Sequence, residues 1–131
     1  MTPVKNIFLI DDDKLFVFLT KKSIQETDIV ANIKEFSDGQ AAIEHIKEIA
    51  ADADQLPDII FLDLSMPIMD GWEFLKEYIV IEPDFGKKVK LYIFSSSISP
   101  HDIERANNIG AVADFIIKPL KKEKIREILA N

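Results

Sequence analysis

Five short apolar runs recur along the chain, and their spacing constrains the fold more than any other feature. They span residues 7–10, 32–36, 59–62, 90–94 and 115–117, and the second is the weakest. A continuous apolar run is typical of a strand that is buried on both faces of a parallel sheet. The sequence therefore predicts five strands of this kind.

Helical patterns separate these runs. Asp13 has the character of an N-cap for a helix over Lys14–Gln25, and Ser37-Asp38-Gly39 predicts the start of a second helix. The second helix has apolar residues at spacings of three and four, at Ala42, Ile43, Ile46, Ile49 and Ala50. Strands that alternate with helices imply right-handed crossovers and helices on both faces of a parallel sheet. We expect an α/β, flavodoxin-like doubly wound fold with five helices and a five-stranded parallel sheet in the order 2-1-3-4-5.

The later helices have their own end signals. Asp70-Gly71 opens a helix whose inner face is expected to hold Trp72, Leu75, Tyr78 and Ile79. Ser99-Pro100-His101-Asp102 has the form of a capping box, and the helix that follows is expected to end at Gly110 in a left-handed cap. The apolar face of the last helix is marked by Ile125, Ile128 and Leu129.

Composition limits the partners and the compartment. The chain has 131 residues, 47% of them hydrophobic, and a formal net charge of −7. This suits a single domain over residues 1–131 without an output domain, and it argues against nucleic acid as a partner, which needs clustered basic residues. No stretch resembles a secretory leader or a membrane span, and cysteine is absent. We expect a cytoplasmic protein that does not bind membranes.

Polar residues follow four of the five predicted strands. They are Asp11-Asp12-Asp13, Asp63, Ser95-Ser96-Ser97 and Lys118-Pro119. The carboxyl ends of parallel strands meet at one edge of the sheet, where open α/β proteins bind their ligands. We therefore expect these groups to converge although they are far apart in sequence.

The converging groups suit phosphoryl transfer. Neighbouring carboxylates repel each other unless a cation is present, and hard oxygen ligands suit Mg²⁺. Aspartate can accept a phosphoryl group, while a lysine and a serine hydroxyl can bind its oxygens. Each group alone has a plainer interpretation as a turn, a cap or a strand exit. His45 and His101 fall on predicted helices, and neither is placed as a base.

The same residues give the chain a resemblance to a known family. From about Asn6 to Leu129 it resembles the response-regulator receiver domain of two-component signalling. The resemblance rests on the run 7–10 with Asp11-Asp12, on Leu-Asp-Leu-Ser-Met-Pro-Ile-Met-Asp-Gly at 62–71, on Ser95 and on Lys118-Pro119. The Met-Pro and Asp-Gly pairs after Asp63 are its most specific part.

The resemblance implies a role for each site residue. Asp63 would accept a phosphoryl group from a sensor histidine kinase or a histidine phosphotransfer protein, and Lys118 would pair with that group. Asp12 and Asp63 would bind Mg²⁺ with the backbone carbonyl of Ser65, and Asp11 would hold the ion mainly through water. The chain would assist its own phosphorylation and dephosphorylation but would otherwise be a signalling domain and not an enzyme.

The resemblance also implies a switch. Ser95 would turn towards the phosphoryl group, Phe115 would follow it inward, and Pro119 would follow a cis peptide bond. The change would remodel the face made by the fourth helix, fifth strand and fifth helix, as a population shift. The signal would pass to an unknown downstream protein or by onward phosphoryl transfer.

Two positions and one connection depart from the common family pattern. Position 95 is Ser where Thr is also common, which keeps the hydroxyl group, and position 115 is Phe where many members have Tyr. An output contact that needs the tyrosine hydroxyl is therefore not available. The connection over residues 82–88 is longer than a compact receiver needs, and we expect a solvated loop there.

Two other functions fit part of the pattern. Asp11 and Asp13 form an Asp-x-Asp pair like that of haloacid-dehalogenase-like phosphatases, whose first Asp is the nucleophile. That assignment leaves no room for a cap domain and makes the spacing after Asp63 a coincidence. A pseudo-receiver that acts only as a binding scaffold would lack an acidic site residue or Lys118, and neither is missing.

Overall fold

The computed structural model describes residues 5–96 and 99–130. Within them the chain forms five strands, five α-helices and one short 3-10 helix. The strands are β1 (Lys5–Ile10), β2 (Ala31–Phe36), β3 (Ile59–Asp63), β4 (Lys90–Ser95) and β5 (Val112–Ile117). The helices are α1 (Lys14–Gln25), α2 (Gly39–Ile49), α3 (Gly71–Ile81), α4 (Pro100–Asn107), α5 (Lys122–Ala130) and the 3-10 helix η1 (Glu82–Asp84). The strands are parallel in the order β2-β1-β3-β4-β5, so the predicted fold and strand order are confirmed.

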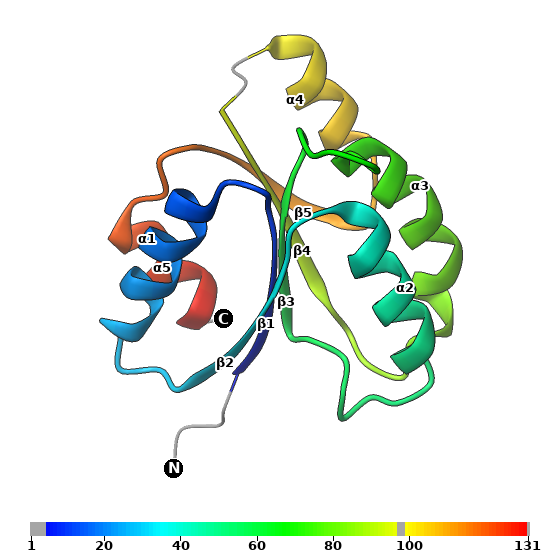
Figure 1. Ribbon diagram of the computed structural model, residues 1–131, viewed down its shortest axis with the longest axis horizontal. Coiled ribbons are helices and arrows are strands. Elements are labelled where there is room, and N and C mark those ends of the chain that lie inside the picture. The colour runs from blue at the N-terminus through cyan, green and yellow to red at the C-terminus, as the bar shows by residue number, and fades with distance from the viewer. Residues whose placement is uncertain (1–4, 97–98, 131) are drawn as a thin grey trace.

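Two helical layers enclose the sheet. Helices α1 and α5 cover one face, and α2, α3 and α4 cover the other (Figure 1). The central strand β3 is buried along its whole length, which explains its unbroken apolar sequence. Because each strand runs in the same direction, all five carboxyl ends lie at one edge, at the top of Figure 1.

Aspartate side chains fix the start of three helices. Asp13 accepts a hydrogen bond from the backbone N–H of Phe16, and Asp38 accepts one from Ala41. Asp70 forms a full capping box with Glu73 at the start of α3. These contacts confirm the predicted starts of α1, α2 and α3.

The ends of α4 differ from the prediction. Ser99 occupies the N-cap and Pro100 the first turn, but Ser99 makes no side-chain capping bond, so the predicted capping box is wrong. The helix ends at Asn107, and the right-handed Asn108 already donates its backbone N–H to the carbonyls of the last turn. Gly110 does not have the positive φ of the predicted left-handed cap. The helix is already closed at Asn108, whose backbone has a right-handed helical conformation, so no left-handed cap residue is needed.

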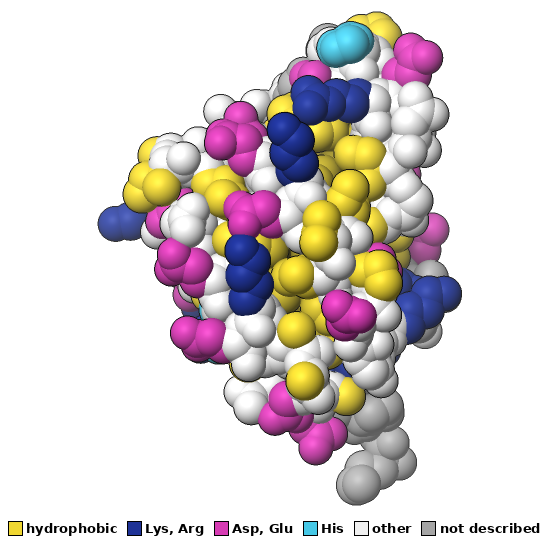
Figure 2. Space-filling model, turned by 90° about the vertical axis from the view of Figure 1, so that its right-hand side faces the viewer, with side chains coloured by type: hydrophobic (Ala, Val, Ile, Leu, Met, Phe, Trp, Pro, Cys, Tyr) yellow, Lys and Arg dark blue, Asp and Glu magenta, His cyan; other side chains and the backbone are white. Residues whose placement is uncertain are grey.

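The inner face of α3 is also rotated from the predicted one. Phe74, Leu75 and Tyr78 are buried, whereas Ile79 is 45% exposed and Trp72 is only partly buried. The guanidinium of Arg105 on α4 covers the Trp72 ring at 4.2 Å from its centroid. Figure 2 views the face covered by α2, α3 and α4 and shows apolar side chains gathered along its middle, between charged ones. The prediction failed because several apolar residues follow one another in this helix, so its periodicity leaves the phase undetermined.

Two further segments are more ordered than the sequence indicated. Strand β5 begins at Val112, three residues before the predicted start at position 115. The sequence does not reveal this earlier start, because the first half of the strand is mostly exposed and lacks a continuous apolar run. The long connection after α3 contains η1, and its Phe85 packs edge-on against Tyr78 at 5.7 Å between ring centroids. Lys87 pairs with Asp58 at 2.8 Å. This connection is therefore anchored to the domain and is not a purely solvated loop.

Candidate functional site

The carboxyl ends of the strands bring the predicted site residues together. Asp11 follows β1, Asp63 ends β3, Ser95 ends β4, and Lys118 follows β5. Asp11, Asp63 and Ser95 are all at least nine-tenths buried. Of the predicted serine loop, Ser97 lies outside the described residues. The edge of the sheet therefore holds the acids, the hydroxyl group and the lysine in one place.

Three carboxylates form the acidic part of the site. One oxygen each from Asp11, Asp12 and Asp63 lies within 4.8 Å of the others, with Asp12 exposed to solvent. The backbone N–H of Asp13 donates to Asp11 Oδ1 at 2.9 Å, while Asp11 Oδ2 is buried and has no partner of hydrogen-bond geometry. Such close carboxylates repel each other, and a cation between them would relieve the repulsion.

Lys118 lies against these acids. Its Nζ atom is 2.8 Å from Asp11 Oδ2 and 3.6 Å from Asp63 Oδ1, and its side chain is 15% exposed. The backbone N–H of Lys118 donates to the Ser95 carbonyl at 2.8 Å, which ties the start of the last loop to β4. The peptide bond between Lys118 and Pro119 is cis. The lysine charge is thus held directly beside Asp63.

The surroundings change the acidity of Asp63. Burial, followed by the negative charge of Asp11, raises the pKa of Asp63 to about 6, although Lys118 acts in the opposite direction. The carboxylate therefore remains mostly ionised at neutral pH, and it is less well stabilised than an exposed one. An added cation would favour the ionised form.

Backbone N–H groups of two glycines, at the starts of α2 and α3, hold the loop from β3 to α3. The backbone N–H of Gly71 donates to the Leu64 carbonyl at 2.9 Å, and that of Gly39 donates to the Met69 carbonyl at 3.1 Å. A Cβ atom on Gly71 would lie 2.6 Å from the Asp63 carbonyl oxygen, so this close approach needs glycine. The loop is thereby fixed against the strand that carries Asp63.

Within this loop, residues 67–69 make a tight turn. The backbone N–H of Met69 donates to the Pro67 carbonyl at 2.7 Å, and Ile68 between them has a φ of 68°. A three-residue turn with positive φ is strained, above all for a β-branched residue. The Ile68 side chain is 78% exposed, so packing does not compensate for the strain.

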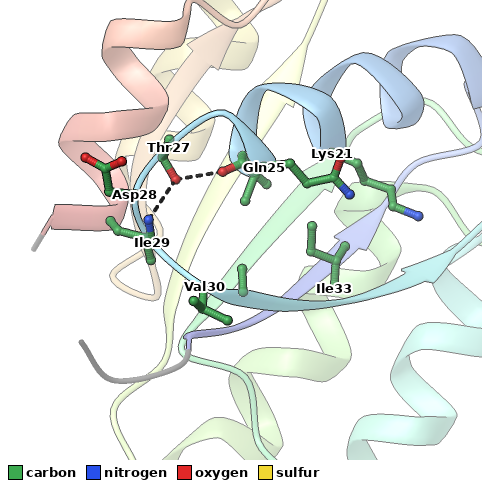
Figure 3. Close-up of a pocket in the computed structure, with 9 residues that line it drawn as sticks. Lys21, Gln25, Thr27, Asp28, Ile29, Val30 and Ile33 are labelled. Atoms are coloured by element: carbon green, nitrogen blue, oxygen red, sulfur yellow. Dashed lines mark hydrogen bonds between the residues drawn. The ribbon is translucent and has the colours of Figure 1, made fainter. Parts of the chain in front are cut away.

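A hollow elsewhere lacks comparable chemistry. A groove of about 440 Å³ lies between the end of α1 and the edge strand β2, at the opposite end of the strands from the acids (Figure 3). Its Thr27 hydroxyl donates to the Ile24 carbonyl and accepts from the Ile29 backbone, and its Lys21 pairs with Glu35. The described residues that line the groove therefore form no cluster of acids, and the acidic edge is the better candidate site.

Comparison with known proteins decides the family. The chain matches the model of the response regulator receiver domain over residues 7–130. It belongs to the response regulator receiver domain family. Phosphorylation and Mg²⁺ binding are features of this family in two-component signalling.

Relatives of this receiver domain cover it almost entirely. The chemotaxis protein CheY of Thermotoga maritima is 31% identical over 121 residues, which is 92% of each chain. A two-component response regulator of Cytophaga hutchinsonii has a similar crystal structure, with a TM-score of 0.87, 28% identity, and coverage of 99% of this chain and 96% of that one. The phosphorylated cyanobacterial phytochrome response regulator RcpA gives a TM-score of 0.78 at 26% identity, covering 97% of this chain and 89% of its own.

The donor set of this receiver domain fits Mg²⁺. Three carboxylates supply hard oxygen ligands and more negative charge than the one lysine beside them offsets. Asp13 does not share this function, because its side chain caps α1. The acids that the sequence grouped together thus divide into a candidate metal site and a helix cap.

One residue at the site, Phe16, could not be recognised from the sequence. The ring of Phe16, in the first turn of α1, lies 4.1 Å from Lys118 Nζ. An apolar residue three positions after an N-cap is usual in a helix, so its residue type gave no signal. Its distance from Lys118 in the sequence also concealed the contact.

Among the described residues, no helix has the length and hydrophobicity to cross a membrane.

Proposed function

We propose that this receiver domain accepts a phosphoryl group on Asp63. The donor is the phosphohistidine of a sensor histidine kinase or of a histidine phosphotransfer protein. The observation that carries the proposal is the position of Asp63 at the end of β3, 3.6 Å from Lys118 Nζ and within 4.8 Å of the Asp11 and Asp12 carboxylates. An anionic acceptor beside both a fixed cation and a candidate metal site is what phosphoryl transfer requires.

The transfer exchanges one bond to phosphorus for another. An Asp63 carboxylate oxygen forms the new P–O bond while the P–N bond of the phosphohistidine breaks, and the histidine nitrogen leaves with the electron pair. Lys118 pairs with a phosphoryl oxygen, and the Ser95 hydroxyl bonds another. Water later hydrolyses the acyl phosphate, so the domain assists its own dephosphorylation.

Asp11, Asp12, Asp63 and the backbone carbonyl of Ser65 are the groups proposed to hold Mg²⁺. Bound there, the ion would supply positive charge to the phosphoryl oxygens. The protein contributes the fixed arrangement of the acids, because Asp11 is tied to the loop by the N–H of Asp13.

The output is proposed to be a conformational switch. Ser95 is buried at the end of β4, and Phe115 on β5 is partly buried against the core. Movement of the Ser95 side chain towards a phosphoryl group leaves space for the Phe115 ring and shifts the α4–β5–α5 face between two states. Residues 1–131 act as one cytoplasmic domain that signals to a protein partner or passes the phosphoryl group on, without binding nucleic acid or membrane.

A phosphatase that uses Asp11 as its nucleophile is less well supported. Asp11 is paired with Lys118, and Asp13, which would be the acid–base partner, is engaged in the cap of α1. The roles that this alternative needs are therefore already filled by structural contacts.

The test is labelling by acetyl phosphate, or by a phosphorylated histidine kinase, with Mg²⁺. We expect Asp63→Asn to abolish the acid-stable, hydroxylamine-sensitive label measured by mass spectrometry, because the acceptor oxygen is lost. Asp13→Asn is the matched control, since it also removes one negative charge from this edge while asparagine still caps the helix. It should label like the wild type.

The opposite pattern would defeat the proposal. If Asp63→Asn still takes up the label and Asp11→Asn does not, Asp11 is the nucleophile and the phosphatase assignment is correct. If the wild type takes up no label and Mg²⁺ with beryllofluoride leaves Trp72 fluorescence unchanged, the domain is a binding scaffold.

A further inference from the structure

We propose that Phe16 is a positioning residue for Lys118, whose ammonium group it holds in place by a cation–π contact beside the phosphoryl site at Asp63. The inference rests on the proposed function, and it adds to the site an aromatic group that touches neither metal nor phosphoryl oxygens.

The contact itself is close. Lys118 Nζ lies 4.1 Å from the centroid of the Phe16 ring, well inside the range of about 6 Å over which such contacts act. The Lys118 side chain is 15% exposed, so water competes only weakly for the ammonium group. A cation over an aromatic face is attracted more strongly when it is poorly hydrated.

A buried aromatic wall fixes the orientation of the ring. Phe16 meets Phe94 edge to face, with ring centroids 5.9 Å apart and planes at 89°. Phe94 is almost fully buried and stacks on Phe61 at 4.5 Å. The Phe16 ring is therefore part of the packed layer between α1 and the sheet, and its face towards Lys118 is held by that packing.

Hydrogen bonds also tie the backbone of Phe16 to the acidic site. Its N–H donates to Asp13 Oδ1 at 3.1 Å, and the N–H of Asp13 donates to Asp11 Oδ1 at 2.9 Å. One short segment thus carries both the acids and the ring. Their relative positions are set within the segment, independently of β5.

The ring differs in kind from the acids that contact Lys118. Asp11 and Asp63 are the carboxylates proposed to hold Mg²⁺ and the phosphoryl group, so their attraction for Lys118 changes when these bind. The ring of Phe16 has no lone pair to offer a metal and no charge to lose. It holds the ammonium group both before and after Mg²⁺ and the phosphoryl group bind. The Lys118 side chain therefore loses less conformational entropy when it pairs with a phosphoryl oxygen.

The experiment measures beryllofluoride and Mg²⁺ affinities separately, by calorimetry on the folded domain. We expect Phe16→Leu to weaken beryllofluoride binding in saturating Mg²⁺ by about three- to tenfold, while Mg²⁺ binding alone stays within about twofold. Phe16→Tyr keeps the aromatic face and should bind beryllofluoride like the wild type. Phe16→Met serves as a second apolar replacement if the leucine variant does not fold.

Coupling to the lysine separates positioning from packing. In a Lys118→Met background, Phe16→Leu should cause no further loss of beryllofluoride affinity, because the partner of the ring is already gone. An equal loss with and without Lys118, an equal loss in the Leu and Tyr variants, or no loss in Phe16→Leu would each show that Phe16 only packs.

The proposed function can fail separately from this inference. A wild-type domain that binds no beryllofluoride defeats the phosphoacceptor assignment, and the positioning role with it. The NMR shift of the Lys118 ε-methylene protons still reports the contact, because the ring shifts these signals upfield in the wild type and not in Phe16→Leu. Tight beryllofluoride binding that is equal in the wild type and in Phe16→Leu overturns the inference alone and leaves the phosphoacceptor assignment intact.

Discussion

Asp63 is held in a state that opposes its own ionisation. The side chain is buried and faces the Asp11 carboxylate, and the single lysine contact described for it does not offset both effects. The protein thus places an acid where its charge is unfavourable until a cation joins it. This is a stability cost that serves the site.

The raised pKa of Asp63 predicts how stability depends on pH. The folded pKa of about 6 lies above the ordinary 3.8, so between these values the native state binds more protons than the unfolded state. The contribution of Asp63 to stability is therefore fully present below about pH 4 and is lost as the pH rises through 6. We expect urea denaturation without Mg²⁺ to show that Asp63→Asn gains stability relative to the wild type across this window. A constant difference between the two proteins from pH 4 to 7 would contradict the prediction.

The positions of some site residues could be predicted from the sequence, and those of others could not. Asp11, Asp63 and Lys118 could be placed from sequence because each follows a strand, and parallel strands end at one edge. Phe16 could not, because its contact with Lys118 joins the first turn of α1 to the loop after β5, which are about a hundred residues apart in the sequence. The left-handed conformation of Ile68 was also not predictable, since nothing in a β-branched side chain indicates it.

The loop from β3 to α3 depends on glycine for its close fit. Gly71 lies so near the Asp63 carbonyl that a side chain cannot enter without moving the strand end or the helix start. Gly110 is different, because a Cβ atom there would meet nothing within 4 Å and its φ is not positive. The two glycines form a matched pair for substitution.

We expect Gly71→Ala to destabilise the domain by about 1–3 kcal/mol, as overpacking of a fitted contact does. Gly110→Ala should be neutral or should stabilise by up to about 1 kcal/mol, since alanine restricts the unfolded chain. The free energies of unfolding in urea measure both. Equal effects of the two substitutions would show that the approach of Gly71 to Asp63 is not a tight constraint.

Helix starts were more predictable than helix faces and strand lengths. The Asp13, Asp38 and Asp70 caps act locally, through side chains that bond backbone groups three residues away, so sequence alone reveals them. The phase of α3 is set by what it packs against, which left Ile79 outside and brought Phe74 inside. The first half of β5 pairs with β4 through its backbone, and its side chains give no apolar run to recognise.

The domain as a whole carries an excess of negative charge, and part of this charge is gathered at one edge of its sheet. Its formal net charge is −7, and three carboxylates share one edge of the sheet. The strand order follows from the alternation of strands and helices, which is why the architecture was predictable before any site was assigned.

Mg²⁺ should therefore stabilise the fold as a ligand of the native state. At a concentration about 100-fold above its dissociation constant the ion adds about 2.7 kcal/mol to the free energy of unfolding. We expect a higher melting temperature in Mg²⁺ than in KCl of equal ionic strength, which screens the net charge equally. Asp12→Asn should lose most of this increase and Asp13→Asn should keep it. An increase that persists in Asp12→Asn would place the ion elsewhere.

The strained turn at Ile68 also affects which conformations the loop visits. A non-glycine residue in the left-handed region costs about 1–2 kcal/mol, and this cost disappears whenever the loop opens and Ile68 returns to negative φ. Compared with a chain that has glycine there, open forms of this loop are populated about 5- to 30-fold more often. The loop that borders Asp63 is thus closed by its glycine contacts and predisposed to open by its isoleucine, so the population of its open forms can be changed at Ile68 without altering a carboxylate or the lysine of the site.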